Sequence, residues 1–270
     1  MPTTVSSGSD HGSRQAPSLW RRLVQRSGAM TFEEAEEAAT ESDDAKPNLR
    51  LRRVATLVAR YAPEGERAGD VLDIGCWTGG LGRILAGMSR CTYTGVDIEP
   101  AAEAVEAARR VVPDGRFLVV PSVETLPFDA ESFDAVVLTE VIEHVPAGRE
   151  GPLLREVARV LRPNGSVIFS TPYYNALTLL DPAWFFGHRH YSVGRVAALA
   201  RGAGLSLRDI RFTGGFWFTV DTNLLYVYKH ILHRPYATYP WLRRLVEREY
   251  RPSPRGTRAT TLWCRMVRSR

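Results

Sequence analysis

Residues 71–80 read VLDIGCWTGG, and this stretch decides the fold prediction. The apolar run 71–75 is typical of a buried strand, and residues 81–88 continue as a helix. Gly75 and Gly79 lie in the turn between them, where the lack of a Cβ lets backbone approach a ligand closely. The following helix begins with N–H groups that have no intrahelical partner, the position that holds pyrophosphate in dinucleotide-binding folds. The turn therefore predicts a ligand site, although similar turns occur in many α/β proteins.

The same alternation of strand and helix continues along the chain. Further strands are predicted at 92–98, 116–121, 133–140 and 166–172. Helices are predicted at 48–61, 100–111, 153–162 and, after Ser192 as cap, 193–204. Apolar strands separated by helices indicate a parallel sheet buried on both faces. With 205–214 and 260–268 closing the sheet, we predict an α/β, doubly wound, mostly parallel seven-stranded fold of Rossmann-like type.

The chain divides into a tail and one domain. Residues 1–45 are rich in small and polar residues and then in acids, so we expect a disordered or partly helical tail. Residues 46–270 form the predicted domain. Within it, 215–258 is aromatic and basic and breaks the strand–helix rhythm. We expect a helical insertion near the substrate site, and packing in the core is the alternative for its aromatic side chains.

Composition limits the class of protein. The 270 residues carry a formal net charge of +5, and no apolar run approaches the length of a membrane span. The N-terminus lacks the pattern of a secretory signal, and three cysteines without metal-type spacing fit a reducing compartment. We expect a cytoplasmic protein. From Ile231 onward the sequence has ten arginines and only two glutamates, so contact with a membrane surface or with phosphates is a further expectation, and a solvated basic surface is the alternative.

Asp97 ends the second predicted strand, about 20 residues after the glycine turn. A carboxylate at this position can accept hydrogen bonds from both hydroxyls of a ribose. The alternative is that Asp97 caps the next helix, because Pro100 follows shortly after it.

The order of motifs is more specific than any one of them. In sequence they are VLDIGCWTGG, VDIEP, SVETLPFDAESFDAVVLTEVIEHVP, LRPNGSVIFSTP and HRHYS. Over roughly residues 48–214 this order resembles the class I methyltransferases that use S-adenosylmethionine (SAM), and in particular their quinone-biosynthesis O-methyltransferase branch. The resemblance implies that family's Rossmann-like methyltransferase fold.

The resemblance also implies roles for individual residues. The amino-acid end of SAM would be lined by the turn, that is by Asp73, Gly75, Cys76, Trp77 and Gly79. The ribose and adenine would be contacted by Asp97, Ile98, Ser122 and Val123. The methionine part and the methyl group would face Thr139 and Glu140.

Two of these positions depart from the family pattern. The family usually has glycine where Trp77 stands, so either the turn differs locally or the indole swings outward. The family often has aspartate where Ser122 stands, so adenine would be recognised by the Ser122 hydroxyl or by the backbone of Val123.

Two histidine-containing motifs carry the candidate chemistry. If a helical turn starts in TEVIEHV, then Glu140, Glu143 and His144 share one face, and HRHYS adds His188 and His190 at the same sheet edge. Divalent Mg, Mn or Zn could be held by Glu140, Glu143, His144 and His188. Alternatively there is no metal, and His144, His188 or His190 packs locally or serves as general base.

These expectations combine into a methyltransferase hypothesis. The leading acceptor is an oxygen of a small or lipid-like molecule, favoured by the aromatic and basic segment. An RNA ribose 2′-O-methyltransferase is the alternative within enzymes, since the isoelectric point is about 9.3 but no RNA-binding module is visible. A catalytically silent SAM-binding protein is the third reading, kept open by Trp77 and Ser122. The sequence does not fix the oligomeric state.

Overall fold

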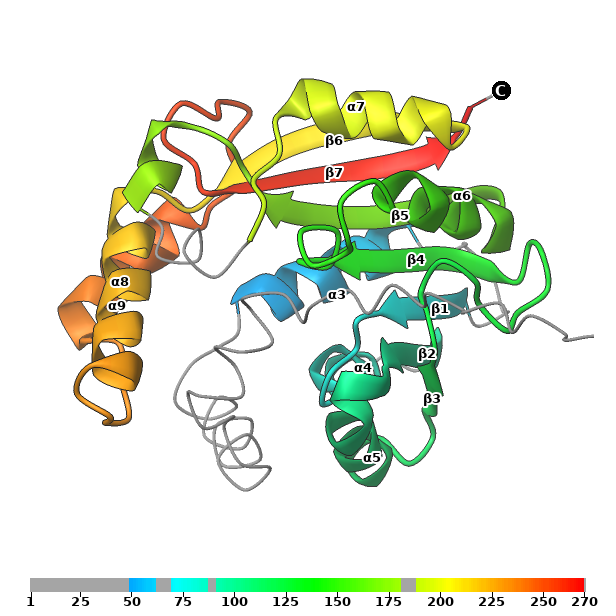
Figure 1. Ribbon diagram of the computed structural model, residues 1–270, viewed down its shortest axis with the longest axis horizontal. Helices are drawn as coiled ribbons and strands as arrows, with labels where there is room; N and C mark the ends of the chain where they lie inside the picture. Colours follow the sequence, from blue (N-terminus) through cyan, green and yellow to red (C-terminus); the bar gives the residue numbers. More distant parts are fainter. Residues whose placement is uncertain (1–48, 62–68, 87–90, 181–187, 270) are drawn as a thin grey trace, which may run out of the picture.

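The computed structural model describes residues 49–61, 69–86, 91–180 and 188–269 (Figure 1). The expected tail 1–45 lies outside them. The strands are β1 (Gly69–Ile74), β2 (Cys91–Ile98), β3 (Arg116–Val120), β4 (Phe133–Thr139), β5 (Leu161–Pro172), β6 (Leu205–Thr213) and β7 (Thr261–Arg268). The helices are α3 (Leu49–Tyr61), α4 (Gly80–Ala86), α5 (Ala102–Val111), α6 (Glu150–Val160), α7 (Val193–Gly202), α8 (Phe216–His230) and α9 (Pro240–Glu249), with short 3-10 helices η1 (Glu99–Ala101) and η2 (Ala176–Leu180).

The strands form one seven-stranded sheet in the order β3-β2-β1-β4-β5-β7-β6. The first five are parallel, and β7 runs antiparallel to both of its neighbours. This confirms the predicted doubly wound fold. The predicted cap of α7 is also present, since the Ser192 hydroxyl accepts a hydrogen bond from the Arg195 N–H.

Both faces of the sheet are covered by helices. Neighbouring residues of one strand point to opposite faces, so Leu72 joins the cluster that includes residues of α6 and α7, whereas Val71 joins the cluster of α3, α4 and α5. Both residues are at most 1% exposed. Burial on the two faces explains why the strands read as continuous apolar runs rather than as alternating ones.

The junction of α6 and β5 differs from the predicted helix 153–162. The helix ends at Val160, and Leu161 already pairs with Phe133 of β4. Pro163 disfavours helical backbone at the residue before it, which ends the helix early. Arg162 consequently lies in the strand, where its Nη1 is 2.7 Å from a carboxylate oxygen of Asp70 and 2.7 Å from one of Asp134.

Helices α8 and α9 occupy part of the aromatic and basic segment. Figure 1 shows them packed side by side, beyond the ends toward which the arrows of β4 and β5 point. Parallel strands place ligand sites at this carboxyl edge. No helix within the described segments is both long and apolar enough to cross a bilayer.

Candidate active site

Two glycines give the turn after β1 a backbone that other residues adopt only with strain. Gly75 has a φ of +79° and Gly79 a φ of +73°, both left-handed. A Cβ on Gly75 would lie 2.6 Å from Val141 Cγ2, and one on Gly79 would lie 2.8 Å from Ala108 Cβ. Glycine is therefore required for conformation and for space, and the turn carries bare backbone at the carboxyl edge.

Trp77 stands where the family usually has glycine, and the structure shows how the turn accommodates it. Its φ is +47°, and its side chain is 53% exposed, so the turn is left-handed there and the indole faces outward. The N–H groups of Gly75 and Cys76 donate to the Val96 carbonyl at 2.8 and 3.1 Å. These bonds attach the turn to β2.

The Asp97 carboxylate lies beside the turn. Its Oδ2 accepts the Trp77 N–H at 2.9 Å, and its Oδ1 accepts the Ile98 N–H at 2.9 Å. Burial raises the pKa of Asp97, and the two backbone hydrogen bonds oppose that shift. The alternative role as a helix cap is not realised, because η1 has Ile98 at its N-cap and no side-chain cap. The half-buried carboxylate thus lies at the carboxyl edge, next to the exposed side chain of Ile98.

Asp73 is a buried carboxyl at the end of β1. The Tyr93 hydroxyl donates to its Oδ2 at 2.6 Å. Burial raises the pKa of Asp73 to about 7, the charge of Asp97 adds to the shift, and the Tyr93 hydrogen bond opposes it. Cys76 is also buried, and burial raises the pKa of its thiol. Asp73 can therefore change charge near neutral pH, whereas the Cys76 thiol stays protonated.

Ser122 and Val123 follow β3 at the same edge. The Ser122 Oγ accepts the Glu124 N–H at 3.1 Å, a local turn contact, and Val123 packs partly buried against the core. The serine hydroxyl still has its own proton to donate.

The segment after β4 is a turn, and the helical turn that would place Glu140, Glu143 and His144 on one face does not start at Glu140. Glu140, next to Thr139 at the end of β4, has a φ of +56°, which is incompatible with a right-handed helix. Ser170 Oγ donates to Glu140 Oε1 at 2.7 Å. Glu140, Glu143 and His144 therefore do not form the expected i, i+3, i+4 face.

Glu143 points into the protein interior. It is 3% exposed, and Thr171 Oγ1 donates to its Oε2 at 3.1 Å. Burial raises the pKa of Glu143 well above the usual range, and the charge of Glu140 adds to this. Within the described part of the chain, no group of three or more His, Cys, Asp or Glu side chains is placed to hold a metal ion. The expected ligand set of Glu140, Glu143, His144 and His188 is not assembled.

The structure brings two of the three candidate histidines together. The rings of His144 and His188 meet edge to face with centroids 4.5 Å apart. Desolvation by the surrounding protein lowers the pKa of His144 to about 4, with contributions from His188, Arg189 and Arg50. His144 is therefore neutral near pH 7 and keeps a lone pair. His190 lies half-buried on the same segment as His188.

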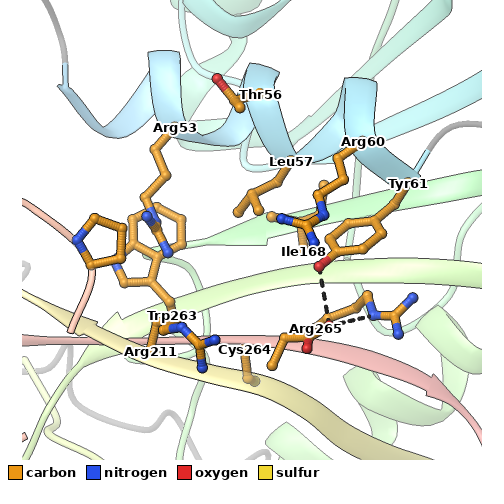
Figure 2. A pocket seen from close by; sticks show the side chains of 12 residues that line it. Arg53, Thr56, Leu57, Arg60, Tyr61, Ile168, Arg211, Trp263, Cys264 and Arg265 are labelled. Atoms are coloured by element: carbon orange, nitrogen blue, oxygen red, sulfur yellow. Dashed lines mark hydrogen bonds and ion pairs between the residues drawn. The ribbon is translucent and has the colours of Figure 1, made fainter. Parts of the chain in front are cut away.

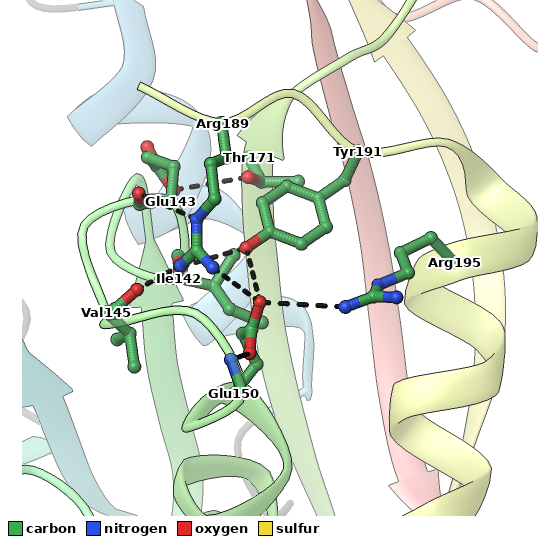
Figure 3. A network of polar contacts seen from close by, with 9 residues as sticks. Ile142, Glu143, Val145, Glu150, Thr171, Arg189, Tyr191 and Arg195 are labelled. Carbon is green, nitrogen blue, oxygen red and sulfur yellow. Dashed lines mark hydrogen bonds and ion pairs between the residues drawn. The ribbon is translucent and has the colours of Figure 1, made fainter. Parts of the chain in front are cut away.

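A polar network holds the HRHYS segment, which carries His188 and His190, against the turn after β4 (Figure 3). Arg189 Nη1 lies 2.6 Å from Glu150 Oε1. The other end of the guanidinium donates to the carbonyls of Ile142 and Val145. The Tyr191 hydroxyl donates to the Ile142 carbonyl at 3.2 Å. Guanidinium, carboxylate and backbone thus fasten the HRHYS segment onto the turn after β4.

A cavity of about 490 Å³ opens next to Glu140. Its walls come from the start of α3, from α8 and α9, and from the start of β7. The lining residues are Leu49, Arg50, Glu140, Phe218, Asp221, Thr222, Leu225, Thr238, Arg243, Val246, Glu247, Tyr250 and Thr261. The volume falls in the range of small-molecule sites.

Sequence reasoning singled out only Glu140 among these lining residues, and two of those it missed, Arg50 and Tyr250, bear on the electrostatics of the site. The Arg50 charge acts on the pKa values of Asp73, Glu143 and His144, so it lies within electrostatic reach of all three. Tyr250 is partly buried, and desolvation raises the pKa of its phenol. Arg50 is one of several arginines in its helix, and Tyr250 is one of many aromatics in its segment. No motif or spacing in the sequence distinguishes either residue. The only available signal was position, since Arg50 precedes β1 and Tyr250 follows α9.

Comparisons with known proteins show which family the chain is related to. Residues 72–169 match a family described as a methyltransferase domain. The chain is 34% identical over 175 residues to the ubiquinone biosynthesis O-methyltransferase of Xanthomonas axonopodis pv. citri, covering 58% of this chain and 70% of that protein. It is 36% identical over 135 residues to the phthiotriol/phenolphthiotriol dimycocerosates methyltransferase of Mycobacterium leprae, covering 50% and 46%.

A solved structure extends the likeness to the whole fold. The TehB-like SAM-dependent methyltransferase of Corynebacterium glutamicum superposes with a TM-score of 0.55 at 16% identity, covering 88% of this chain and 97% of that one. Identity this low shows the fold alone. The 34% identity to the Xanthomonas enzyme, over 70% of that enzyme's length, shows the family as well as the fold. The chain therefore belongs to the class I SAM-dependent methyltransferases and is an enzyme of that family.

Proposed function

We propose that this enzyme methylates an oxygen of a small or lipid-like acceptor held in the cavity beside Glu140. The observation that carries the proposal is the position of that cavity. It meets the carboxyl edge at the end of β4 and is otherwise walled largely by α8 and α9. The two curated relatives are named for ubiquinone biosynthesis and for phthiotriol dimycocerosates, which supports a lipid-like acceptor.

The residues around the glycine turn fit the cofactor. The two left-handed glycines let the turn pack closely against Val141 and Ala108, and a half-buried carboxylate stands beside the turn. When bound, SAM supplies a sulfonium methyl group to a nucleophilic acceptor. We assign the ribose to Asp97, the adenine side to Ile98, Ser122 and Val123, and the amino-acid end to the turn with Asp73. The cationic ammonium of an amino acid favours the ionised form of Asp73.

The acceptor cavity mixes apolar and charged walls. Phe218 and Leu225 of α8 offer apolar surface. Arg243 and Glu247 neutralise each other in an ion pair of 3.1 Å along α9. An acceptor with an apolar body and a polar reacting end suits these walls, with the reacting end toward Glu140.

We assign His144 the role of general base, which takes up the proton that the methyl acceptor releases. Its imidazole is neutral near pH 7 and lies within electrostatic reach of Arg50, which lines the cavity. Holding donor and acceptor at reacting distance supplies much of the rate, and a positioned base contributes about 10² to 10⁴-fold.

The test separates cofactor binding from turnover. The assay uses labelled SAM with a short-chain prenylated catechol, and calorimetry gives the SAM dissociation constant. We expect His144→Ala to lower turnover at least about 100-fold with SAM affinity little changed. Asp97→Ala should weaken SAM at least about tenfold. The exposed His233, replaced by alanine, is the matched control.

Other outcomes contradict parts of the proposal. Full turnover in His144→Ala with intact SAM binding removes that residue from proton transfer. Unchanged SAM affinity in Asp97→Ala removes the ribose contact. Incubation with labelled SAM and a cell extract tests the acceptor class: label in RNA overturns a lipid-like acceptor, and SAM binding without any labelled product overturns the enzyme activity.

A further inference from the structure

A second cavity lies away from the glycine turn, between α3 and the sheet. It measures about 260 Å³ and is walled by α3, by β5, β6 and β7, and by Pro252. Figure 2 shows Arg53 and Arg60 reaching down from α3, and Arg211 and Arg265 on the strands below them. The full lining is Arg53, Thr56, Leu57, Arg60, Tyr61, Ile168, Asp209, Arg211, Pro252, Trp263, Cys264 and Arg265.

The cavity has a strong excess of positive charge. It contains four arginines and one carboxylate, that of Asp209. Asp209 Oδ2 lies 3.0 Å from Arg265 Nε and also accepts the Tyr61 hydroxyl at 3.0 Å. Among the described residues, Arg53, Arg60 and Arg211 have no carboxylate within ion-pair distance. Three positive charges therefore share the cavity without an anionic partner there.

Arg53 shows that this is more than a solvated basic surface. Its guanidinium lies over the Trp263 ring, 4.9 Å from the centroid. Its Nε is buried and has no hydrogen-bond acceptor in the described part of the chain. Burial lowers the pKa of Arg53, and the nearby charge of Arg211 acts in the same direction. A partly buried cation with a missing acceptor is costly, and an anion in the cavity would satisfy it.

We propose that this cavity binds the phosphate group of a small phosphorylated ligand, or of a lipid headgroup. Guanidinium groups form paired hydrogen bonds with phosphate oxygens, and here they converge from a helix and two strands. The volume lies just below the usual range for drug-sized ligands, which suits a phosphomonoester or a diphosphate. The site is distinct from the glycine turn and does not depend on methyl transfer.

Pyrophosphate is the probe, and calorimetry on the full chain is the measurement. We expect the double variant Arg60→Gln/Arg211→Gln to bind pyrophosphate at least about tenfold more weakly than wild type, because each exposed arginine contributes a charged hydrogen bond. Arg208→Gln, on the same strand but outside the cavity, is the matched control. Asp209→Asn removes the one negative charge and should tighten binding several-fold. SAM affinity, unchanged in all variants, serves as the check of folding.

A second arm identifies the source of the phosphate. The probes are phosphatidylcholine vesicles with and without phosphatidic acid. Binding that requires phosphatidic acid and is lost in the double variant supports a lipid headgroup, whereas pyrophosphate binding without vesicle binding supports a soluble ligand. The proposal is overturned if wild type does not bind pyrophosphate, or if the double variant binds it as tightly as Arg208→Gln does.

Discussion

Tyr93→Phe is the sharpest test of the buried polar pair under the glycine turn. The substitution keeps the ring, which packs 5.6 Å from Phe117, and removes only the hydroxyl that donates to Asp73. The pKa of Asp73 is about 7, so this carboxyl is ionised above that pH and protonated below it. A hydrogen bond to an ionised group contributes about 1.5–3 kcal/mol, and one to a neutral group about 1 kcal/mol.

The expected loss therefore depends on pH. We expect the unfolding free energy to fall by about 2–3 kcal/mol at pH 8.5 and by about 1 kcal/mol at pH 5.5. Urea titration followed by circular dichroism measures both values. The exposed Tyr174, replaced by phenylalanine, is the control and should change stability little. An equal loss at the two pH values would show that Asp73 does not change charge in this range, and no loss would refute the hydrogen bond's contribution.

Two further substitutions test the backbone and the network. Gly79→Ala places a Cβ 2.8 Å from a side chain of α5 at a left-handed φ, so it should cost about 2–4 kcal/mol of unfolding free energy in urea. Gly148→Ala has a φ of +86° but no neighbour within 4 Å, so it should cost only about 1–2 kcal/mol, and equal costs would contradict the clash. Glu150→Gln removes the carboxylate from Arg189 and should cost about 2–3 kcal/mol at pH 7. Burial pushes the pKa of Glu150 upward, but hydrogen bonds and Arg189 outweigh it and hold the pKa below the usual 4.5, so wild-type stability from this pair is present above about pH 4.5 and is lost as pH falls through the lowered pKa. A variant with the same acid sensitivity as wild type would refute this, and Glu106→Gln, in an exposed ion pair, is its control.

The fold could be predicted because its signals are local. Each strand carries its own apolar run, and each helix its own period, so the strand at Val71 and the helix after Gly79 follow from neighbouring residues. The predicted end of α6 was wrong because Leu161 fits the helical period of the sequence, whereas in the structure it pairs with Phe133 of β4.

The candidate site was only partly predictable, because much of it depends on contacts between residues far apart in the sequence. The spacing of the motifs predicted that Asp97 and the glycines lie at one edge of the sheet. The turn after β4 depends on the left-handed backbone of Glu140, which no sequence pattern predicts. The two cavities are built from helices and strands far apart in sequence. Arg53 and Arg211, for example, meet only because β6 lies near α3 in the folded sheet.

The position of β7 has a consequence for how the chain can fold during synthesis. β6 lies at the sheet edge, and apart from an isolated bridge between Phe212 and Ser253 it pairs only with β7, the last of the described strands along the chain. Until residues 261–268 have left the ribosome, β6 has no strand to pair with, and β5 presents an open edge to other nascent chains. Protection of amides in β6 should therefore appear late, together with that of β7, long after the first five strands have been made.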